Sequence, residues 1–307
     1  MRKIAVALVA FSLVTVACSK KTDTGGTSTT PTGTSAATTA ADCATSATFL
    51  TPDTLTVGTS APAYPPFFQG GSNSQDWSIN DPNNGKGLES AVAYEVAKRM
   101  GFTADQVKWV QVKFAQSYAV GTKPFDMNIQ QVSYKPKRAE AVDFSDSYYD
   151  FTQAVVAIKG TPITQATSIA DLKPYTFAAQ LGTTNYDTIT DVIQPTSEPG
   201  VYQSLSDTVA ALNAGQVDGI VVDYPTAVYI ADPYVQEVKN SVVVGQFENA
   251  PGAEPEHYGI TLAKGSPLTA CVNLALAEMK ADGTLAAIQK TWLSDKTNVG
   301  KVPVFTP

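Results

Sequence analysis

Histidine and cysteine are scarce in this sequence, which contains one histidine, His257, and three cysteines. Zinc and most other transition metals are bound by several imidazole or thiolate groups that lie close together. One histidine and three widely spaced cysteines supply no such group, so we expect no metal site and no cofactor. No Ser-His or Cys-His pair can be recognised either, and His257 is interpreted as a solvent-facing or hinge-packing residue.

Clusters of basic residues and long apolar segments are also missing from most of the chain. The 21 lysines and arginines are outnumbered by 28 acidic residues, and the net charge is −7. A phosphate backbone attracts clustered positive charge, so we expect no nucleic acid partner. The one long apolar run in the sequence, Ile4–Val16, is shorter than the roughly 20 residues that a membrane-spanning helix needs.

This N-terminal run has the features of a secretory signal. It follows a basic start and precedes Ala17-Cys18, so residues 1–17 are predicted to be a signal peptide. A cysteine directly after a small residue is typical of bacterial lipoproteins, which would be acylated here on Cys18. Secretion without an anchor is the alternative, because Thr15 stands where such signals usually carry leucine. With the anchor, the protein would be held outside the cytoplasm at the cell membrane.

The next segment, residues 18–47, consists mostly of threonine, serine, glycine, alanine and proline. Such a segment buries too little apolar surface to offset the entropy of ordering, so we expect a flexible tether. If Cys18 is acylated, Cys43 and Cys271 form an even pair in an oxidising compartment, and they are predicted to form a disulfide. The alternative is that both are unpaired small apolar residues.

Apolar periodicity in the remaining sequence predicts alternating strands and helices, an order typical of parallel sheets. Apolar residues recur at every fourth position from Leu88 to Met100 and predict an amphipathic helix that Gly101 ends. Pro267 favours the start of another long helix, Leu268–Ala281. The alternation begins again after residue 152, so we expect two lobes. Their predicted boundaries are 48–152 and 256–307 for the first lobe and 153–255 for the second.

Three polar elements could together bind one small zwitterion. The first is Arg138, on a turn after a predicted strand and near Ser133, because a guanidinium can bind a carboxylate with two hydrogen bonds. The second is the turn Gly182-Thr183-Thr184, where the free N–H groups at a helix start favour an anion. The third is Asp223, at the C-terminal end of an apolar strand, where a carboxylate can accept hydrogen bonds from an ammonium group.

Each element also has a simpler interpretation. Arg138 could be a surface residue paired with Glu140, and the Gly-Thr-Thr turn could be an ordinary helix cap. Asp223 could serve the turn that follows its strand. Two candidate aromatic walls, Tyr64 and Phe114, could equally be core residues. The order of the elements favours the binding interpretation, because the arginine lies in one β/α series and the aspartate in the other.

Several blocks of the sequence, in this order along the chain, resemble one known family. The blocks are VGTSAPAYPPF, GLESAVAYEVAKRMGF, FDMNIQQVSYKPKRAEAVDFSDSYYD, SIADLKPYTFAAQLGTT, ALNAGQVDGIVVDYPTAVYIA and YGITLAKGSPL, followed by LALAEMKADGTLAAIQKTWL. Over roughly residues 55 to 293, they are similar to the amino acid-binding proteins of bacterial ABC importers, family 3 of the extracellular solute-binding proteins.

This resemblance implies the type II periplasmic binding protein fold: two α/β lobes, each a mostly parallel sheet flanked by helices, joined by two hinge segments. The hinges should lie near Phe151–Gln153 and Glu256–Tyr258. The protein would bind an L-amino acid between the lobes and, as a monomer, deliver it to an ABC permease in the membrane. A dehydratase-like enzyme on the same fold and an amino acid sensor are the alternatives.

The resemblance also implies how the two charged groups of the ligand are bound. It implies that Arg138 and Thr184 bind the carboxylate, with Ser133 assisting. The ammonium group would be bound by Asp223 and the backbone of Gln131.

For the ligand's side chain, the resemblance implies a place between the rings of Tyr64 and Phe114. Gln180 and Thr183 complete the expected site. Gln180 and Val222 stand where some family members carry basic or imidazole groups, so a polar or neutral amino acid is the expected ligand.

Two departures from the family pattern are Lys135, at a position that is usually threonine, and the long segment Gln69–Lys86. The cost of desolvating an unpaired charge leads to one further expectation. If Arg138 and Asp223 lack partners, the cleft should stay open until a zwitterion pairs with both.

Overall fold

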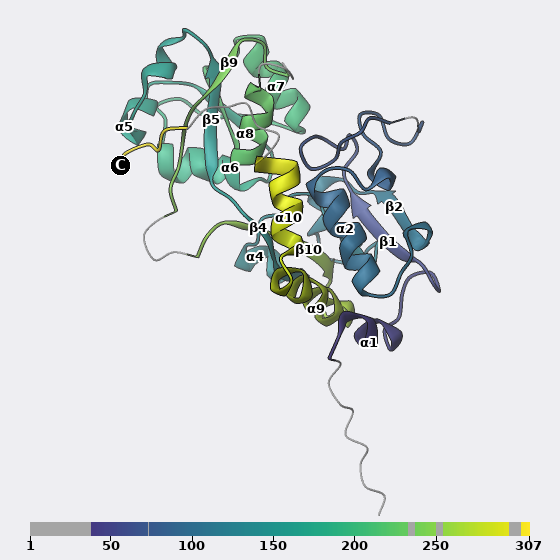
Figure 1. The fold of residues 1–307 in the computed structure, drawn as a ribbon. Coiled ribbons are helices and arrows are strands. Elements are labelled where there is room, and N and C mark those ends of the chain that lie inside the picture. The colour runs from purple at the N-terminus through teal and green to yellow at the C-terminus, as the bar shows by residue number, and fades with distance from the viewer. Residues whose placement is uncertain (1–37, 73, 233–236, 250–253, 295–301) are drawn as a thin grey trace, which may run out of the picture. The chain divides into compact units, whose positions relative to one another are not determined.

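The structure, a computed structural model, describes residues 38–72, 74–232, 237–249, 254–294 and 302–307. These residues form two five-stranded sheets flanked by helices (Figure 1). The two-lobed α/β fold expected from the sequence is thereby confirmed. Among the described residues, no helix combines the length and the apolar character that crossing a membrane requires. The predicted signal peptide and Cys18 lie outside the described residues.

The first lobe is built on a sheet with the strand order β2-β1-β3-β10-β4. Its strands are β1 (Leu55–Thr59), β2 (Val107–Gln111), β3 (Met127–Asn128), β4 (Val142–Asp150) and β10 (His257–Ala263). The helices of this part are α1 (Ala40–Thr45), α2 (Leu88–Arg99), α3 (Phe114–Ser117), α4 (Pro136–Ala139), α9 (Leu268–Ala281) and α10 (Thr284–Gln289). Single turns are formed by Pro82–Asn84, Ala104–Gln106 and Lys290–Ser294.

The second lobe is built on a sheet with the strand order β7-β6-β8-β5-β9. Its strands are β5 (Gln153–Ile158), β6 (Phe177–Gln180), β7 (Gly200–Tyr202), β8 (Gly219–Asp223) and β9 (Ser241–Gln246). Its helices are α5 (Ile169–Leu172), α6 (Thr184–Asp187), α7 (Leu205–Asn213) and α8 (Tyr224–Ala231), with turns at Pro162–Gln165 and Thr188–Ile193.

Both sheets are mixed. The pairs β1–β2, β1–β3, β6–β7 and β6–β8 are parallel, as the β/α alternation predicts. In contrast, β10 is antiparallel to β3 and β4, and β5 is antiparallel to β8 and β9. The antiparallel pairs involve the strands next to the lobe crossings, since the chain leaves the first lobe through β4, enters the second through β5 and returns through β10.

The amphipathic helix predicted from the spacing of apolar residues is α2. Leu88, Val92 and Val96 are fully buried, and they pack in one core with Leu55 and Val57 of the first sheet. The helix ends where glycine adopts left-handed backbone, at Gly101 with φ 91°. The sequence pattern therefore identified both the buried face and the end of this helix.

The flexible tether is shorter than the sequence analysis expects. Residues 40–45 form α1, in which Thr39 caps the first turn by accepting a hydrogen bond from the Asp42 N–H group. Ala40 and Ala44 are buried against the first lobe, and α1 lies beside α9 in Figure 1. The predicted disulfide between Cys43 and Cys271 is present and joins these two helices, with 5.2 Å between the Cα atoms. Buried Ala40 and Ala44 and the disulfide attach this segment to the first lobe, which its polar composition alone did not suggest.

The last residues of the chain belong to the second lobe, and their assignment to the first lobe is wrong. Val304 forms a parallel bridge with Gln246, and Thr306 forms one with Ser168. The ring of Phe305 packs in a hydrophobic core of the second lobe, 5.2 Å from the ring of Phe247. A buried aromatic side chain gives this short segment its attachment to the sheet.

We expect Phe305→Ala to destabilise the second lobe, because its ring packs directly against the backbone of Gly245, where a larger residue would leave no room. A Cβ atom at Gly245 would lie 2.6 Å from the Phe305 ring. Loss of a buried phenylalanine ring lowers the free energy of unfolding by about 3 kcal/mol. Urea denaturation followed by circular dichroism would measure it, with the exposed neighbour Val304→Ala as the matched control. Equal midpoints for the two variants would contradict this role of Phe305.

Candidate functional site

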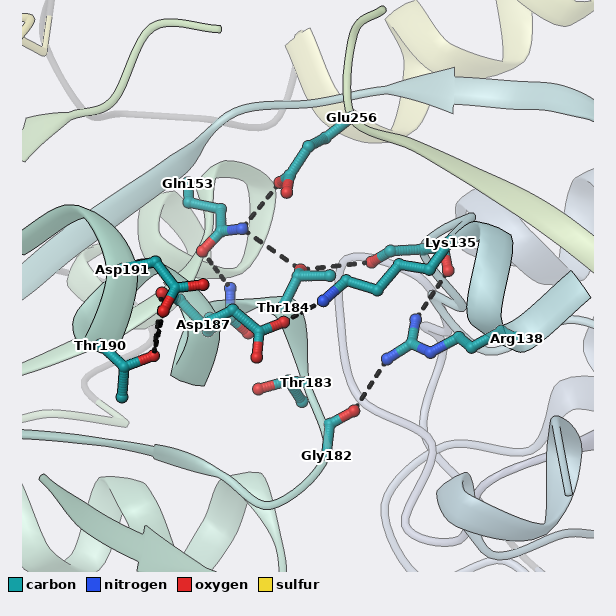
Figure 2. A network of polar contacts seen from close by, with 12 residues as sticks. Lys135, Arg138, Gln153, Gly182, Thr183, Thr184, Asp187, Thr190, Asp191 and Glu256 are labelled. Carbon is teal, nitrogen blue, oxygen red and sulfur yellow. Dashed lines mark hydrogen bonds and ion pairs between the residues drawn. The ribbon is translucent and has the colours of Figure 1, made fainter.

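Arg138 is part of a polar network that joins the two lobes (Figure 2). It belongs to α4 and is 8% exposed. Its Nη1 donates a hydrogen bond to the carbonyl oxygen of Ser133 (2.6 Å), in its own lobe. Its Nη2 donates to the carbonyl oxygen of Gly182 (2.8 Å), on the loop between β6 and α6 of the other lobe. Arg138 is therefore a buried residue of the site and not a surface residue paired with Glu140.

Two aromatic rings support this guanidinium group. Its central carbon lies 4.5 Å from the centre of the Tyr118 ring and 5.7 Å from that of Phe114, within the range of cation–π interaction. The two rings meet edge to face at 5.4 Å. Phe114 begins the helical turn α3 rather than ending a strand, because β2 ends at Gln111. The structure thus places Phe114 beside Arg138.

Tyr118 is a site residue that the sequence analysis missed. Its hydroxyl donates to the Gly182 carbonyl oxygen at 3.3 Å, so it contacts the same acceptor as Arg138. The signal was its position four residues after Phe114, a spacing that brings two side chains together in a helical turn.

Burial is the main influence on the charge of Arg138. Desolvation lowers the pKa of the guanidinium group, and Tyr118, Asp187 and Asp223 oppose this shift. A guanidinium group has five N–H donors, so hydrogen bonds from Nη1 and Nη2 to carbonyl oxygens leave others for a carboxylate. The group can therefore bind an anion while it stays attached to both lobes.

A second part of the network surrounds Gln153, the first residue of β5. Its Nε2 donates to the Thr184 hydroxyl (3.2 Å) and to a Glu256 carboxylate oxygen (2.7 Å). Its Oε1 accepts from Asn185 (3.0 Å), whose amide nitrogen also donates to Asp223 (2.7 Å). Gln153 and Asn185 were not predicted, although Asn185 directly follows the predicted Gly-Thr-Thr turn. They connect the two expected poles of the site.

Thr184 lies where the resemblance expects it, near Ser133 of the other lobe. The two hydroxyl oxygens are 3.5 Å apart, and both residues are buried. Thr183 precedes α6, and its hydroxyl donates to the Gln180 carbonyl oxygen at 2.8 Å. The Ser133 and Thr184 hydroxyl groups therefore lie next to each other between the lobes. Thr183 and Gln180 instead stabilise the turn that precedes α6.

Asp223, at the end of β8, accepts two hydrogen bonds from protein groups. One comes from Asn185, and the other comes from the Tyr258 hydroxyl of the first lobe at 2.5 Å. Burial raises the pKa of Asp223 to about 6, and the hydrogen bonds from Tyr258 and Asn185 and the charge of Arg138 oppose the rise, whereas Glu256 adds to it. The expectation that Arg138 and Asp223 lack partners is wrong in this structure, because both are hydrogen-bonded across the lobes.

Lys135 also connects the lobes. Its ammonium group forms an ion pair with Asp187 of α6. Figure 2 shows the Lys135 and Arg138 side chains extending from the same segment toward the loop and helix of the second lobe. Lys135, which stands at a position that is usually threonine in the family, therefore supplies a contact between the lobes.

Gln131 is held in position by a buried carboxylate. Its φ of 51° lies in the left-handed region. Its backbone N–H donates to Glu89 at 2.6 Å, and its side-chain amide and the Tyr148 hydroxyl donate to the same carboxylate. Glu89 is 0% exposed, and burial raises its pKa to about 7, against the lowering effect of these three hydrogen bonds. Glu89 was not predicted from the sequence, although it lies three residues before Val92 on the buried face of α2.

Tyr64 and Gln131 line a pocket that is partly open to solvent. Residues of α7 and α8 of the second lobe form its other side. Phe114 is not among the lining residues, so the structure does not place Tyr64 and Phe114 as two walls of this pocket. His257 stacks on the Tyr134 ring at 5.4 Å at the start of β10, with its Nδ1 3.1 Å from the Pro255 carbonyl oxygen. Within the described residues, no group of histidine, cysteine, aspartate and glutamate could hold a metal ion.

Two α/β lobes that share a charged, hydrogen-bonded site define the class of two-lobed binding proteins. The chain matches the bacterial extracellular solute-binding proteins, family 3, over residues 55–295, and it belongs to this family. It is 32% identical over 244 residues to the L-cystine-binding protein TcyA of Bacillus subtilis (strain 168), covering 78% of this chain and 81% of TcyA.

Solved structures agree with this membership. An ancestral arginine-binding protein bound to arginine matches with a TM-score of 0.63 and 28% identity, over 78% of this chain and 98% of that one. An ancestral amino acid-binding protein described as a precursor of cyclohexadienyl dehydratase matches with a TM-score of 0.62 and 27% identity, over 78% and 95% of the two chains. The family name indicates a location outside the cytoplasm.

The buried carboxylate of Glu89 should make stability depend on pH. Its pKa is about 7 in the folded protein and 4.5 ordinarily, so the folded state binds more protons between these values. Stability should therefore fall as pH rises from about 4.5 to 7, by about 3 kcal/mol from this group. Glu89→Gln should remove that slope, and denaturation midpoints at several pH values would measure it.

A matched control is the exposed Glu140→Gln, which should follow the pH dependence of the parent protein. Parallel curves for the parent and Glu89→Gln would contradict the inferred charge change at Glu89.

Proposed function

We propose that this protein is the substrate-binding component of an amino acid ABC importer. It captures an L-amino acid between its two lobes and delivers it to a permease in the membrane. The observation that carries this proposal is a pair of opposite charges joined by one polar network: Arg138 of the first lobe, which is buried, and Asp223 of the second, which is half-buried. A zwitterion with its charges one carbon apart complements such a pair. The family membership and the relatives named for cystine and arginine binding support it.

The ligand carboxylate would be bound by Arg138, with the Ser133 and Thr184 hydroxyls as further donors. These two hydroxyls are 3.5 Å apart and come from different lobes, so an anion between them would contact both lobes at once. Charge-assisted hydrogen bonds of this type are stronger than neutral ones. The carboxylate would take a position beside the carbonyl oxygens that Arg138 contacts.

The ammonium group would be bound by Asp223. Its oxygens accept from Asn185 and Tyr258, and each carboxylate oxygen has a second lone pair for an ammonium donor. The backbone of Gln131, which lines the adjoining pocket, is the second proposed acceptor. Since a buried carboxylate without a cation is costly, an ammonium group would stabilise the charged form of Asp223.

Lobe closure would be coupled to binding through the two crossing segments. Phe151 donates its N–H to the Glu256 carbonyl oxygen at 2.9 Å, so the segments lie side by side. Hinges in such proteins are a few residues between rigid elements. Because the ligand would contact Arg138 on one lobe and Asp223 on the other, it stabilises the closed arrangement more than the open one.

At the cell surface, the proposed acyl anchor on Cys18 and the tether that follows it would keep the binding domain near its permease. The ordered domain begins before Ala40, where the backbone N–H group donates to Glu278 of α9 at 2.9 Å. About 20 tether residues could then span up to about 70 Å when extended. The lobes could thus reach a permease without detaching from the membrane.

The proposed binding of the ligand carboxylate by Arg138 can be tested with Arg138→Ala. We expect affinity for the best-bound amino acid to fall by about 100-fold or more, because the ligand carboxylate would lose its buried charged partner. Isothermal titration calorimetry against a panel of L-amino acids would measure this, with the exposed Lys137→Ala as the charge-matched control. Unchanged affinity in Arg138→Ala, or no binding of any amino acid by the parent, would contradict the proposal.

The proposed binding of the ammonium group by Asp223 predicts that ligand affinity depends on pH. The pKa of Asp223 is about 6, so its carboxylate becomes protonated as pH falls through 6. Affinity should therefore fall by about tenfold for each pH unit below 6. Asp223→Asn should bind weakly and lose this dependence, whereas the exposed Asp146→Asn should keep it. Titrations between pH 4.5 and 8 would decide, and a pH-independent parent would argue against Asp223 as the ammonium partner.

A further inference from the structure

The pocket beside Gln131 extends the proposed ligand site away from Arg138. It is formed by Tyr64 and Gln131 of the first lobe and by α7 and α8 of the second. Gln131 lies two residues before Ser133, and α8 begins directly after Asp223. The pocket therefore adjoins both proposed poles of the amino acid and has contacts with both lobes.

Helix α8 runs from Asp223 along the pocket, so it indicates how far a bound side chain would have to extend. Thr226 and Tyr229 both line the pocket, three and six residues after Asp223. With a rise of 1.5 Å per residue, Tyr229 lies about 9 Å along the helix from Asp223. A ligand held at Asp223 by its ammonium group would therefore need a long side chain to fill this pocket.

The walls of the pocket combine apolar and acidic groups. Leu205 and Val209 of α7 supply aliphatic surface, and Tyr64 and Tyr229 supply rings with hydroxyl groups. Glu237 is the only charged side chain among the described residues that line the pocket, and it is exposed. A long aliphatic stem with a cation at its end matches this combination of apolar, aromatic and acidic groups.

The electrostatic environment of Tyr229 agrees with this match. Its pKa is raised to about 12, chiefly by burial, and further by the negative charges of Glu237 and Asp232. Tyr64 contributes in the same direction from the other lobe. Negative charge thus extends over the second-lobe side of the pocket, which favours a cation there and disfavours an anion.

We propose that this pocket receives the far end of the ligand's side chain, and that the substrates are α-amino acids whose long side chains end in a guanidinium or ammonium group paired with Glu237. This inference rests on the proposed function and names its substrate class. It differs from the polar or neutral ligand expected from Gln180 and Val222, because neither residue lines the pocket.

Pairs of ligands with equal length and different charge test this inference. L-arginine and L-citrulline share the stem and differ in the charge of the terminal group. L-lysine and L-2-aminoheptanoic acid have side chains of equal length that end in an ammonium and a methyl group. We expect the parent protein to bind the cationic member of each pair about tenfold or more tightly. Isothermal titration calorimetry at pH 7.5 and constant ionic strength would measure the four affinities.

Glu237→Gln removes the proposed partner and leaves the pocket shape nearly unchanged. It should weaken L-arginine binding by about threefold to fivefold, as expected for an exposed ion pair, and change L-citrulline binding less than twofold. Glu237→Lys should weaken L-arginine binding further, through like-charge repulsion. The control Glu198→Gln, an exposed residue of the same lobe that does not line the pocket, should leave both affinities unchanged.

The outcomes separate this inference from the proposed function. If the parent protein binds L-citrulline as tightly as L-arginine, or if Glu237→Gln weakens both equally, the assignment of a cationic side chain is overturned. Tight binding of neutral amino acids that is lost in Arg138→Ala would then leave the proposed function standing. If no amino acid binds the parent protein, the proposed function fails first.

Discussion

The site depends on how a buried guanidinium group is kept charged. Arg138 is almost completely buried, and a charge in such a place is stable only with strong partners. Its partners are the Ser133 and Gly182 carbonyl oxygens and the ring of Tyr118. Because the Gly182 carbonyl comes from the second lobe, the requirement to pair one charge also determines how the two lobes meet. The proposed capture of a carboxylate uses the donors that this arrangement leaves.

Two carboxylates with little solvent contact, Glu89 and Asp223, each accept a hydrogen bond from a tyrosine of the first lobe. Glu89 accepts from Tyr148, and Asp223 accepts from Tyr258, whose rings lie 5.8 Å apart. Burial raises the pKa of both carboxylates, to about 7 and about 6. Glu89 is therefore about half protonated near pH 7, whereas Asp223 reaches that point only near pH 6. A cation bound at Asp223 would favour the release of its proton, which links ligand binding to the charge state of this carboxylate.

The ends of the described chain are fastened to different lobes. Near the N-terminal side, the Cys43–Cys271 disulfide joins α1 to α9 of the first lobe. At the C-terminal end, Phe305 is buried in the second lobe, although the helices before it belong to the first. Leu293 packs in the core of the first lobe, whereas Val302 and Phe305 pack in the second. The described C-terminal residues thus add contacts to the second lobe beyond those of β5–β9.

The sequence by itself determined the two-lobed fold, helices such as α2 and Leu268–Ala281, and the disulfide. It also singled out Arg138, Ser133, Thr184 and Asp223, which one polar network joins in the structure. These features follow from local periodicity, residue chemistry and family blocks, which a single chain segment can carry. Only the tertiary structure decided that Arg138 and Asp223 have partners, that Phe114 and Tyr118 support the guanidinium group, and that Glu89 holds Gln131. Those facts depend on distances between segments far apart in sequence, and burial, which raises or lowers each pKa, exists only once the segments have packed.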